Sequence, residues 1–260
     1  DHYESLIVVG TSVRKRAEVL KPYLESLAWQ ELPPRTRLHY VFVDDGCDKE
    51  TRSLLEEFVS VRRGEILRGV PAAVGDFTDV HPTTHQWSTS AMRRVGANKD
   101  RILRRALEIK ADAVWLVDAD LICDTTTLCS LASTDKPIAC AVYWTHWQRQ
   151  AAETRQSYAG PQVWLRHPYQ LDGRGQDEFE FRRKLLSRGL VRVWGQGACT
   201  LIRRPVLEAG ITFGCTPWQV LVKVEIPGAL HPLLDVPLVV GLHAGLLIPC
   251  SFTSRRQLTA

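Results

Sequence analysis

The chain has 260 residues, a length that suits one large domain or a domain with an appended lobe. Its residues are 45% hydrophobic and 24% charged, which excludes a disordered, collagenous or coiled-coil chain. The net charge of +4 comes from 33 basic and 29 acidic residues, and so small an excess does not by itself indicate a nucleic-acid partner.

The apolar runs and the cysteines predict a cytoplasmic protein without a transmembrane segment. No cationic and apolar leader opens the chain, and the longest nearly uncharged run, residues 236–250, is shorter than the roughly 20 residues of a membrane span. We interpret that run as a pair of buried strands. The 7 cysteines never form a C-x-x-C pair, which argues against a disulfide scaffold or a zinc site and suits a reducing compartment.

Strands and helices alternate along the first half of the chain. Short apolar runs predict strands at residues 6–9, 38–43, 65–67, 113–117 and 138–143. Apolar residues at helical spacing predict helices at residues 16–29, 49–59, 90–110 and 126–132. Alternation of this kind predicts an α/β fold with a doubly wound, mainly parallel sheet.

The second half has a different pattern. Residues 144–183 are rich in Trp, Tyr, Gln, Arg and Gly without clear periodicity, so we expect loops and short strands that form a wall over the carboxyl edge of the sheet. Strands are expected at 190–194 and 198–202, and a short helix at 204–209. We therefore divide the single domain into two halves, residues 1–143 and 144–260.

Two of the predicted strands end in acidic clusters. Asp44 and Asp45 follow the second strand, and Asp118 and Asp120 follow the strand at 113–117. Ligands of open α/β sheets bind beyond the carboxyl ends of the strands. In an extended turn Asp118 and Asp120 point the same way, and paired carboxylates suit Mg²⁺ or Mn²⁺ bridged to phosphates. A solvated acidic turn is the alternative interpretation.

Five segments in the right order resemble the family-2-type glycosyltransferases. They are residues 6–30, the strand end at 43–46, the helix carrying Asn98, Arg101 and Ala106, the D-x-D strand at 114–120, and the Gly-rich segment at 195–204. A sixth segment, residues 237–243, resembles the family's last strand and its histidine. The resemblance implies a GT-A-like fold, a nucleotide-diphosphate sugar donor and a divalent cation, Mn²⁺ or Mg²⁺.

The resemblance also implies roles for individual residues. The half at 1–143 would bind the nucleotide sugar and the half at 144–260 the acceptor. Nucleotide-sugar contacts are expected from Thr11 and Arg14, just after the first strand, and from Asp44, Asp45, Asn98, Arg101 and Asp118. Metal ligands are expected at Asp118, Asp120 and His243, with His231 as the competitor of His243.

The catalytic base is where the sequence departs from the family. The family's usual Glu-Asp pair after the Gly-rich segment is absent from residues 211–234. Transfer to a hydroxyl needs a carboxylate that takes the proton. We expect this carboxylate to be Glu225, with Asp235 behind it, while Asp177 and Glu180 are further candidates.

Aromatic residues of the second half are candidates for sugar contacts, because the C–H faces of sugars stack on aromatic rings. Trp144 and Trp164 are expected on the acceptor side, and Gly197 and Ala198 near the donor sugar or acceptor. Filling of the core beneath the sheet is the alternative role for such rings.

The sequence therefore predicts a metal-dependent, inverting glycosyltransferase of the hexosyltransferase class. It would move a sugar from a UDP- or GDP-sugar to a hydroxyl of a glycan or glycoconjugate. Alternatives are a DNA-modifying sugar transferase, a nucleic-acid-binding module rich in Arg and Trp, and a sugar nucleotidyltransferase. The last would carry a Gly-rich phosphate loop, and residues 11–14 lack those glycines.

Overall fold

The computed structural model describes most of the first half of the chain and parts of the second. The described residues are 5–14, 17–71, 89–151, 154–164, 176–187, 189–193, 195–196, 198–212, 238–242 and 251–252.

Strands and helices of the first half alternate as expected. In chain order they are β1 (Ser5–Val13), α1 (Ala17–Ala28), β2 (Thr36–Asp44), α2 (Lys49–Val61), β3 (Gly64–Arg68), α3 (Thr89–Glu108), β4 (Ala113–Val117), β5 (Leu121–Ile122), α4 (Thr127–Ser133) and β6 (Ile138–Ala141). In the second half they are β7 (Trp144–Ala151), β8 (Thr154–Pro161), β9 (Val163–Trp164), α5 (Gln176–Leu185), β10 (Gly189–Val193), β11 (Gly195–Gln196), β12 (Cys199–Arg203), α6 (Arg204–Thr212), β13 (Leu238–Leu242) and β14 (Ser251–Phe252).

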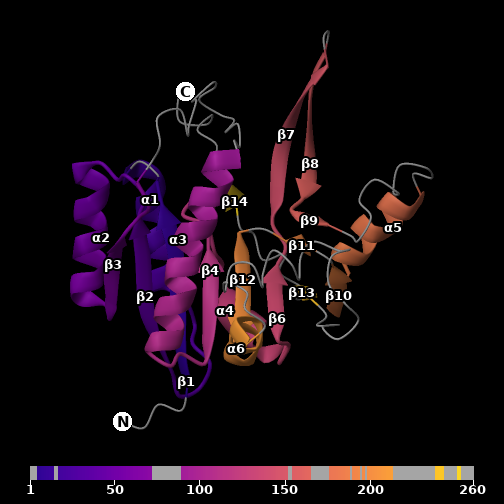
Figure 1. Cartoon of the computed structure of the whole chain (residues 1–260). Helices are drawn as coiled ribbons and strands as arrows, with labels where there is room; N and C mark the ends of the chain where they lie inside the picture. The colour runs from indigo at the N-terminus through magenta and orange to yellow at the C-terminus, as the bar shows by residue number, and fades with distance from the viewer. Residues whose placement is uncertain are drawn as a thin grey trace.

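Within the described part of the chain, eight strands form one sheet in the order β10-β13-β6-β12-β4-β1-β2-β3 (Figure 1). The pairs β4-β1, β1-β2, β2-β3 and β13-β6 are parallel, whereas β12 runs antiparallel to both β4 and β6. The strand β10 is antiparallel to β13 at the edge. The predicted α/β fold with a mainly parallel, GT-A-like sheet is confirmed by this topology.

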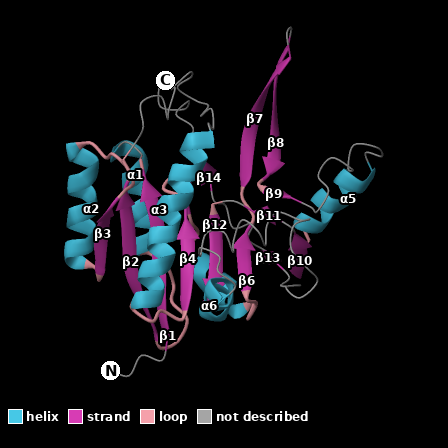
Figure 2. Ribbon diagram, viewed as in Figure 1, coloured by secondary structure: helices cyan, strands magenta, loops and turns pink. Residues whose placement is uncertain are grey.

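Helices cover both faces of the sheet (Figure 2), as buried strands with apolar side chains on both sides require. Successive side chains of a strand point to opposite faces. In β1, Ile7 and Val9 belong to the apolar cluster under α1, α2 and α4. Leu6 and Val8 belong to the cluster under α3, α5 and α6. The sheet is therefore doubly wound.

A glycine in β1 lets α3 lie close to the sheet. A Cβ atom at Gly10 would collide with Cγ2 of Ile102 in α3 and would lie 3.1 Å from a methyl group of Leu116. Ile102 is fully buried at this contact. The absence of a side chain at residue 10 therefore sets how closely the helix approaches the strands.

Two predictions made from the sequence are wrong in this part of the fold. The first strand is Ser5–Val13 rather than 6–9, so Thr11 lies inside it and not after it. Residues 144–183 contain more regular structure than loops and short strands, namely the β7–β8 hairpin and α5. The hairpin pairs in register from Trp144 with Pro161 to Ala151 with Thr154, and it extends away from the sheet (Figure 1). Its polar strands carry no apolar alternation, which is why the pattern missed it.

The apolar run at 236–250 does contain a strand, β13, which lies between β10 and β6. Residues 243–250 are outside the described part of the chain. Within the described residues, none of the helices has the length and apolar character needed to cross a membrane.

Candidate functional site

The acidic strand ends meet at one edge of the sheet. The strand β1 lies between β2 and β4 and is parallel to both, so the carboxyl ends of the three strands share an edge. Asp44 is the last residue of β2 and pairs in register with Val13, and Asp118 directly follows β4. The topology therefore brings Asp44 and Asp118 to the same edge, as the sequence predicted.

The Asp44 carboxylate is held by its own segment. Its Oδ1 accepts hydrogen bonds from the backbone N–H groups of Gly46 (3.1 Å) and Cys47 (2.8 Å). Its Oδ2 lies 2.9 Å from Nη1 of Arg52, whose side chain is 54% exposed. These contacts close the turn between β2 and α2 and fix the direction of the carboxylate.

Cys47 does not offer a nucleophile at this edge. Burial, together with the neighbouring Asp44 carboxylate, raises the pKa of its thiol to about 12. Its Sγ donates to the carbonyl oxygen of Val13 at 3.3 Å. The thiol is therefore protonated at neutral pH, whereas a nucleophilic cysteine reacts as the thiolate.

Asp45 forms a buried ion pair with α3. Its Oδ2 lies 3.4 Å from Nη2 of Arg94, and the two side chains are 2% and 4% exposed. Burial raises the pKa of Asp45, although Arg94 and a hydrogen bond with Asn98 act in the opposite direction. A buried carboxylate that still keeps a raised pKa shows that the ion pair does not fully offset the cost of burial. Asp45 is thus a support beneath the edge.

Asn98 ties three segments together. Its side chain is fully buried, its Nδ2 donates to Oγ of Ser12 at 3.1 Å, and its Oδ1 accepts from the backbone N–H of Val70 at 2.9 Å. The amide therefore joins the end of β1, the segment after β3 and Asp45 to α3. The structure gives Asn98 a positioning role, and its predicted contact with a nucleotide stays a prediction.

Thr11 also acts inside the protein. Its hydroxyl donates to the carbonyl oxygen of Val117 at 2.8 Å, and the hydroxyl of Tyr23 contacts both Thr11 and the same carbonyl oxygen (3.3 Å for the latter). Both side chains are buried, and burial raises the pKa of Tyr23 well above its ordinary value. Together they fix the peptide immediately before Asp118. The structure thus gives Thr11 a positioning role, and its predicted place in the lining of a nucleotide pocket stays a prediction.

The second half of the chain reaches the edge through Ala198. Its carbonyl oxygen accepts a hydrogen bond from the backbone N–H of Asp118 at 2.8 Å. Its φ angle of 28° lies in the left-handed region, which is unfavourable for a residue with a Cβ atom and is concentrated at functional sites. The Gly-rich segment thus joins the D-x-D strand at its end, where the sequence placed a donor-sugar contact.

Asp118 forms an ion pair with a lysine of α3. Nζ of Lys99 lies 3.1 Å from Oδ1 of Asp118, and the side chains are 15% and 41% exposed. Asp120 is half-buried two residues further on. These two carboxylates are hard oxygen donors, and two carboxylates completed by phosphate oxygens and water suit Mg²⁺ or Mn²⁺. Among the described residues, no group of three or more His, Cys, Asp or Glu side chains could hold a metal ion.

Two further basic residues lie at this edge. Arg14 is exposed at the end of β1, where its Nη1 lies 3.9 Å from the position of a Cβ atom on Gly46, and its charge acts on the pKa of Asp45. Nη1 of Arg101 donates to the carbonyl oxygen of Arg68 at 2.8 Å, next to the end of β3. Both arginines are thus on the side of the edge that carries Asp44 and Asp45.

The two tryptophans predicted on the acceptor side lie in strands of the second half of the chain. Trp144 is half-buried and packs against the apolar cluster under α3, so part of its surface fills the core. Trp164 lies in β9, whose backbone pairs with β11. Further predicted residues lie outside the described part of the chain, namely Gly197, Glu225, His231, Asp235 and His243.

Sequence reasoning missed two residues of the site. Tyr23 has the spacing of an apolar helix position, and nothing in that spacing marks its hydroxyl as a partner of Val117. Arg52 lies on α2 as one of many surface arginines, and its contact with Asp44 depends on the turn geometry. Only the folded chain identifies either residue.

No protein-family model matches the sequence, and no curated protein matches it. Among solved structures, S. aureus TarS 1-349 is 13% identical with a TM-score of 0.46, and the match covers 90% of this chain and 57% of that chain. Another S. aureus TarS structure is 15% identical with a TM-score of 0.44, covering 78% and 29%. The mannosyltransferase PcManGT from Pyrobaculum calidifontis, in complex with GDP-Man and Mn²⁺, is 14% identical with a TM-score of 0.43, covering 90% and 56%. The chain thus spans between 29% and 57% of the length of these proteins.

Proposed function

We propose that this chain binds a nucleotide-diphosphate sugar at the carboxyl edge of β1, β2 and β4 and transfers the sugar, with inversion, to a hydroxyl of a glycan or glycoconjugate. One observation carries the proposal. Two acidic strand ends flank β1, and each is paired with a basic side chain of the same helix, Asp45 with Arg94 and Asp118 with Lys99. An edge that holds both charges in fixed positions suits a diphosphate and its counter-cation.

The residues of the edge would have different roles in binding the donor. Asp44 would orient the base or ribose from its fixed turn, and Arg14 and Arg101 would contribute positive charge nearby. Asp118 and Asp120, with His243, would hold Mn²⁺ or Mg²⁺. The bound cation would supply positive charge that stabilises the departing nucleoside diphosphate. Asp45, Asn98 and Thr11 would keep the strand ends in place.

The second half of the chain would supply the acceptor side. We propose Glu225 as the carboxylate that takes the proton of the acceptor hydroxyl, with Asp235 as the alternative. The Gly-rich segment at Gly197 and Ala198 would lie against the donor sugar, because Ala198 already contacts the backbone of Asp118. Trp144 and Trp164 would contact the acceptor sugar.

Thermal unfolding with donor and metal tests the proposal. We expect UDP-GlcNAc or GDP-Man, which differ in base and in sugar, to raise the unfolding temperature in the presence of MnCl₂. At a hundredfold excess over Kd a ligand stabilises by about 2.7 kcal/mol. Asp120→Asn should abolish the shift that depends on Mn²⁺, because it removes one proposed carboxylate ligand.

The matched control is Asp135→Asn, which removes a carboxylate from a side chain that is 96% exposed. This variant should keep the full shift. An equal shift in Asp120→Asn and wild type would contradict the metal-bridged donor site. Incubation of the same donors with a panel of glycan acceptors then identifies the sugar that is transferred.

A further inference from the structure

The two side chains of the ion pair between Lys99 and Asp118 differ in their exposure to solvent. The Lys99 side chain is 15% exposed, whereas the Asp118 side chain is 41% exposed. A cation from solvent can therefore reach the open side of the carboxylate while the ammonium stays on the other side. Such a partly exposed pair contributes little to the stability of the fold, so stability alone does not account for it.

The position of Lys99 is set by its helix. The preceding residue, Asn98, is bonded to Ser12 and to Val70, and Ile102 packs against Gly10 in the same part of α3. The helix is thus attached to the end of β1 on both sides of Lys99. The backbone of Lys99 is consequently held in place. The ammonium group can change partners through a movement of the lysine side chain alone.

A lysine and a divalent cation compete for one carboxylate. Both are attracted to Asp118 and repel each other, so the ammonium disfavours a metal ion that arrives alone. A diphosphate changes the balance, because its oxygens accept hydrogen bonds from an ammonium group. The ammonium can then leave Asp118 for a phosphate oxygen without losing a negatively charged partner.

We infer that Lys99 is an exchange residue. It neutralises Asp118 while the edge holds no nucleotide, and it turns to a phosphate oxygen when a nucleoside diphosphate arrives with its cation, which leaves Asp118 to the cation. The inference rests on the proposed function and adds a binding order to it. The edge disfavours a metal ion that binds before the nucleotide. Lys99 thereby binds the phosphate of the nucleotide, and it weakens the binding of a metal ion in the absence of nucleotide.

The exchange predicts effects of opposite sign for two ligands in one variant. Lys99→Met should bind MnCl₂ alone about fivefold more tightly than wild type, because the competing ammonium is gone. It should bind UDP or GDP without metal about tenfold more weakly, because a charged hydrogen bond to phosphate is lost. The free Mn²⁺ signal in electron paramagnetic resonance measures the first effect, and calorimetry measures the second.

Two further variants separate the exchange from other effects. Arg104→Met removes one positive charge from the exposed side of the same helix, where Arg104 pairs with Asp100, and it should change neither affinity by more than about twofold. Lys99→Gln, a second neutral variant, should reproduce both signs of Lys99→Met. Circular dichroism checks that each variant is folded.

The outcomes distinguish the two proposals. Wild-type protein that binds neither Mn²⁺ nor any nucleotide would overturn the proposed function and the exchange with it. Wild-type protein that binds both, with unchanged or weaker Mn²⁺ binding in both Lys99 variants, would overturn the exchange alone. Tighter Mn²⁺ binding with weaker nucleotide binding in both variants would support it.

Discussion

Asp45 and Arg94 show how buried residues support the edge from inside the protein. Both side chains are almost fully buried. Asp45 follows Asp44 directly in the chain, and Arg94 lies one helical turn before Asn98 in α3. Removal of one partner of a buried ion pair leaves the other charge in a poorly solvated place. Substituting both residues together should therefore destabilise the protein by less than the sum of the two single substitutions.

We expect Asp45→Asn to lower the free energy of unfolding by about 3 kcal/mol, because it removes the carboxylate beside a buried guanidinium. The double variant Asp45→Asn/Arg94→Met should lose less than the sum of the two single variants. Urea unfolding at pH 7 measures these values, with Asp135→Asn as the exposed control that changes stability by less than about 0.5 kcal/mol. Additive losses would show that the two side chains do not act as a pair.

At the residue scale, the sequence predicts the acidic residues at the strand ends. It predicts few of the side-chain contacts that fix these residues in place. Asp44 and Asp118 are identifiable because each follows an apolar run, and position in a parallel sheet then implies a shared edge. The contacts of Thr11 and Tyr23 with Val117 join residues that are 106 and 94 positions apart in the chain. No local pattern in the sequence predicts these contacts, because they form only when β4 pairs with β1 and α1 packs on the sheet.

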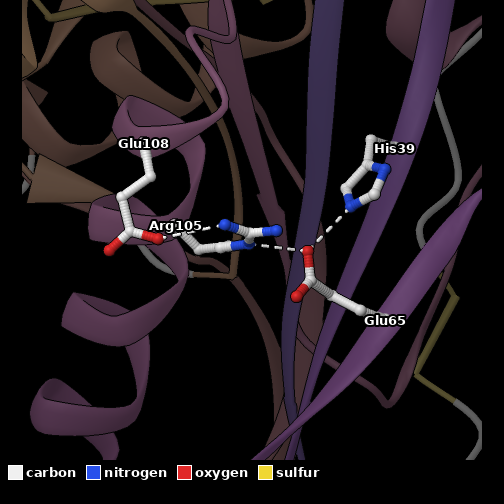
Figure 3. A network of polar contacts seen from close by, with 4 residues as sticks. All are labelled: His39, Glu65, Arg105 and Glu108. Carbon is white, nitrogen blue, oxygen red and sulfur yellow. Dashed lines mark hydrogen bonds and ion pairs between the residues drawn. The ribbon is translucent and has the colours of Figure 1, made fainter.

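At the scale of elements, α3 is attached to the sheet at both of its ends. Near its N-terminal end Arg94 and Asn98 hold it to the edge, and near its C-terminal end Arg105 joins it to β3 (Figure 3). Nε of Arg105 and Nε2 of His39 lie 2.8 and 2.9 Å from the same oxygen of Glu65, Oε1. Arg105 also pairs with Glu108 at 3.1 Å. A charged network thus fixes the helix that carries Lys99.

The network gives α3 a pH dependence. Burial raises the pKa of Glu65, but hydrogen bonds from Arg105 and His39 outweigh it and lower the pKa below the ordinary 4.5. A carboxylate with a lowered pKa adds stability above its unfolded pKa and loses that stability as the pH falls through the folded one. Glu65→Gln should therefore cost about 1 kcal/mol at pH 6 and much less at pH 3.

Urea unfolding at the two pH values measures this difference, and the exposed Glu57→Gln is the matched control on α2. The control should change stability little at either pH. A loss in Glu65→Gln that is equal at pH 6 and pH 3 would show that the neutral side chain packs badly and that the charge contributes nothing.

Periodicity predicts the elements of the first half because each has a face buried in one of two apolar clusters. The helix α1 shows this, with Leu20, Tyr23, Leu24 and Leu27 buried at helical spacing. The same logic fails for the β7–β8 hairpin, whose strands are stabilised by pairing with each other. A hairpin whose strands do not alternate apolar and polar residues gives no periodic signal in the sequence.

At the scale of the whole molecule, the proposed reaction needs both halves of the chain. The donor edge is built mainly from residues 1–143, and the proposed base comes from the other half. We therefore expect Glu225→Gln to lower kcat for transfer by about 10² to 10⁴, the range typical of a lost general base. The unfolding-temperature shift with donor and Mn²⁺ should stay as in wild type. Assays with the acceptor found in the panel measure the rate.

Asp235→Asn is the control for that experiment and should keep most of the transfer rate. The opposite pattern, with Asp235→Asn inactive and Glu225→Gln active, would assign the base to Asp235. Loss of the donor-induced shift in Glu225→Gln would contradict the separation of binding from proton removal.

The position of β12 has a consequence for how the protein is made. This strand comes from residues 199–203 yet lies between β4 and β6, both of the first half, and pairs with each (Figure 1). On a ribosome, β6 would emerge well before the strand that connects it to β4. The sheet of the nascent chain therefore cannot close until β12 is made, and before that the edges of β4 and β6 that later pair with β12 are exposed and favour aggregation. Truncation after residue 143 should yield an insoluble fragment.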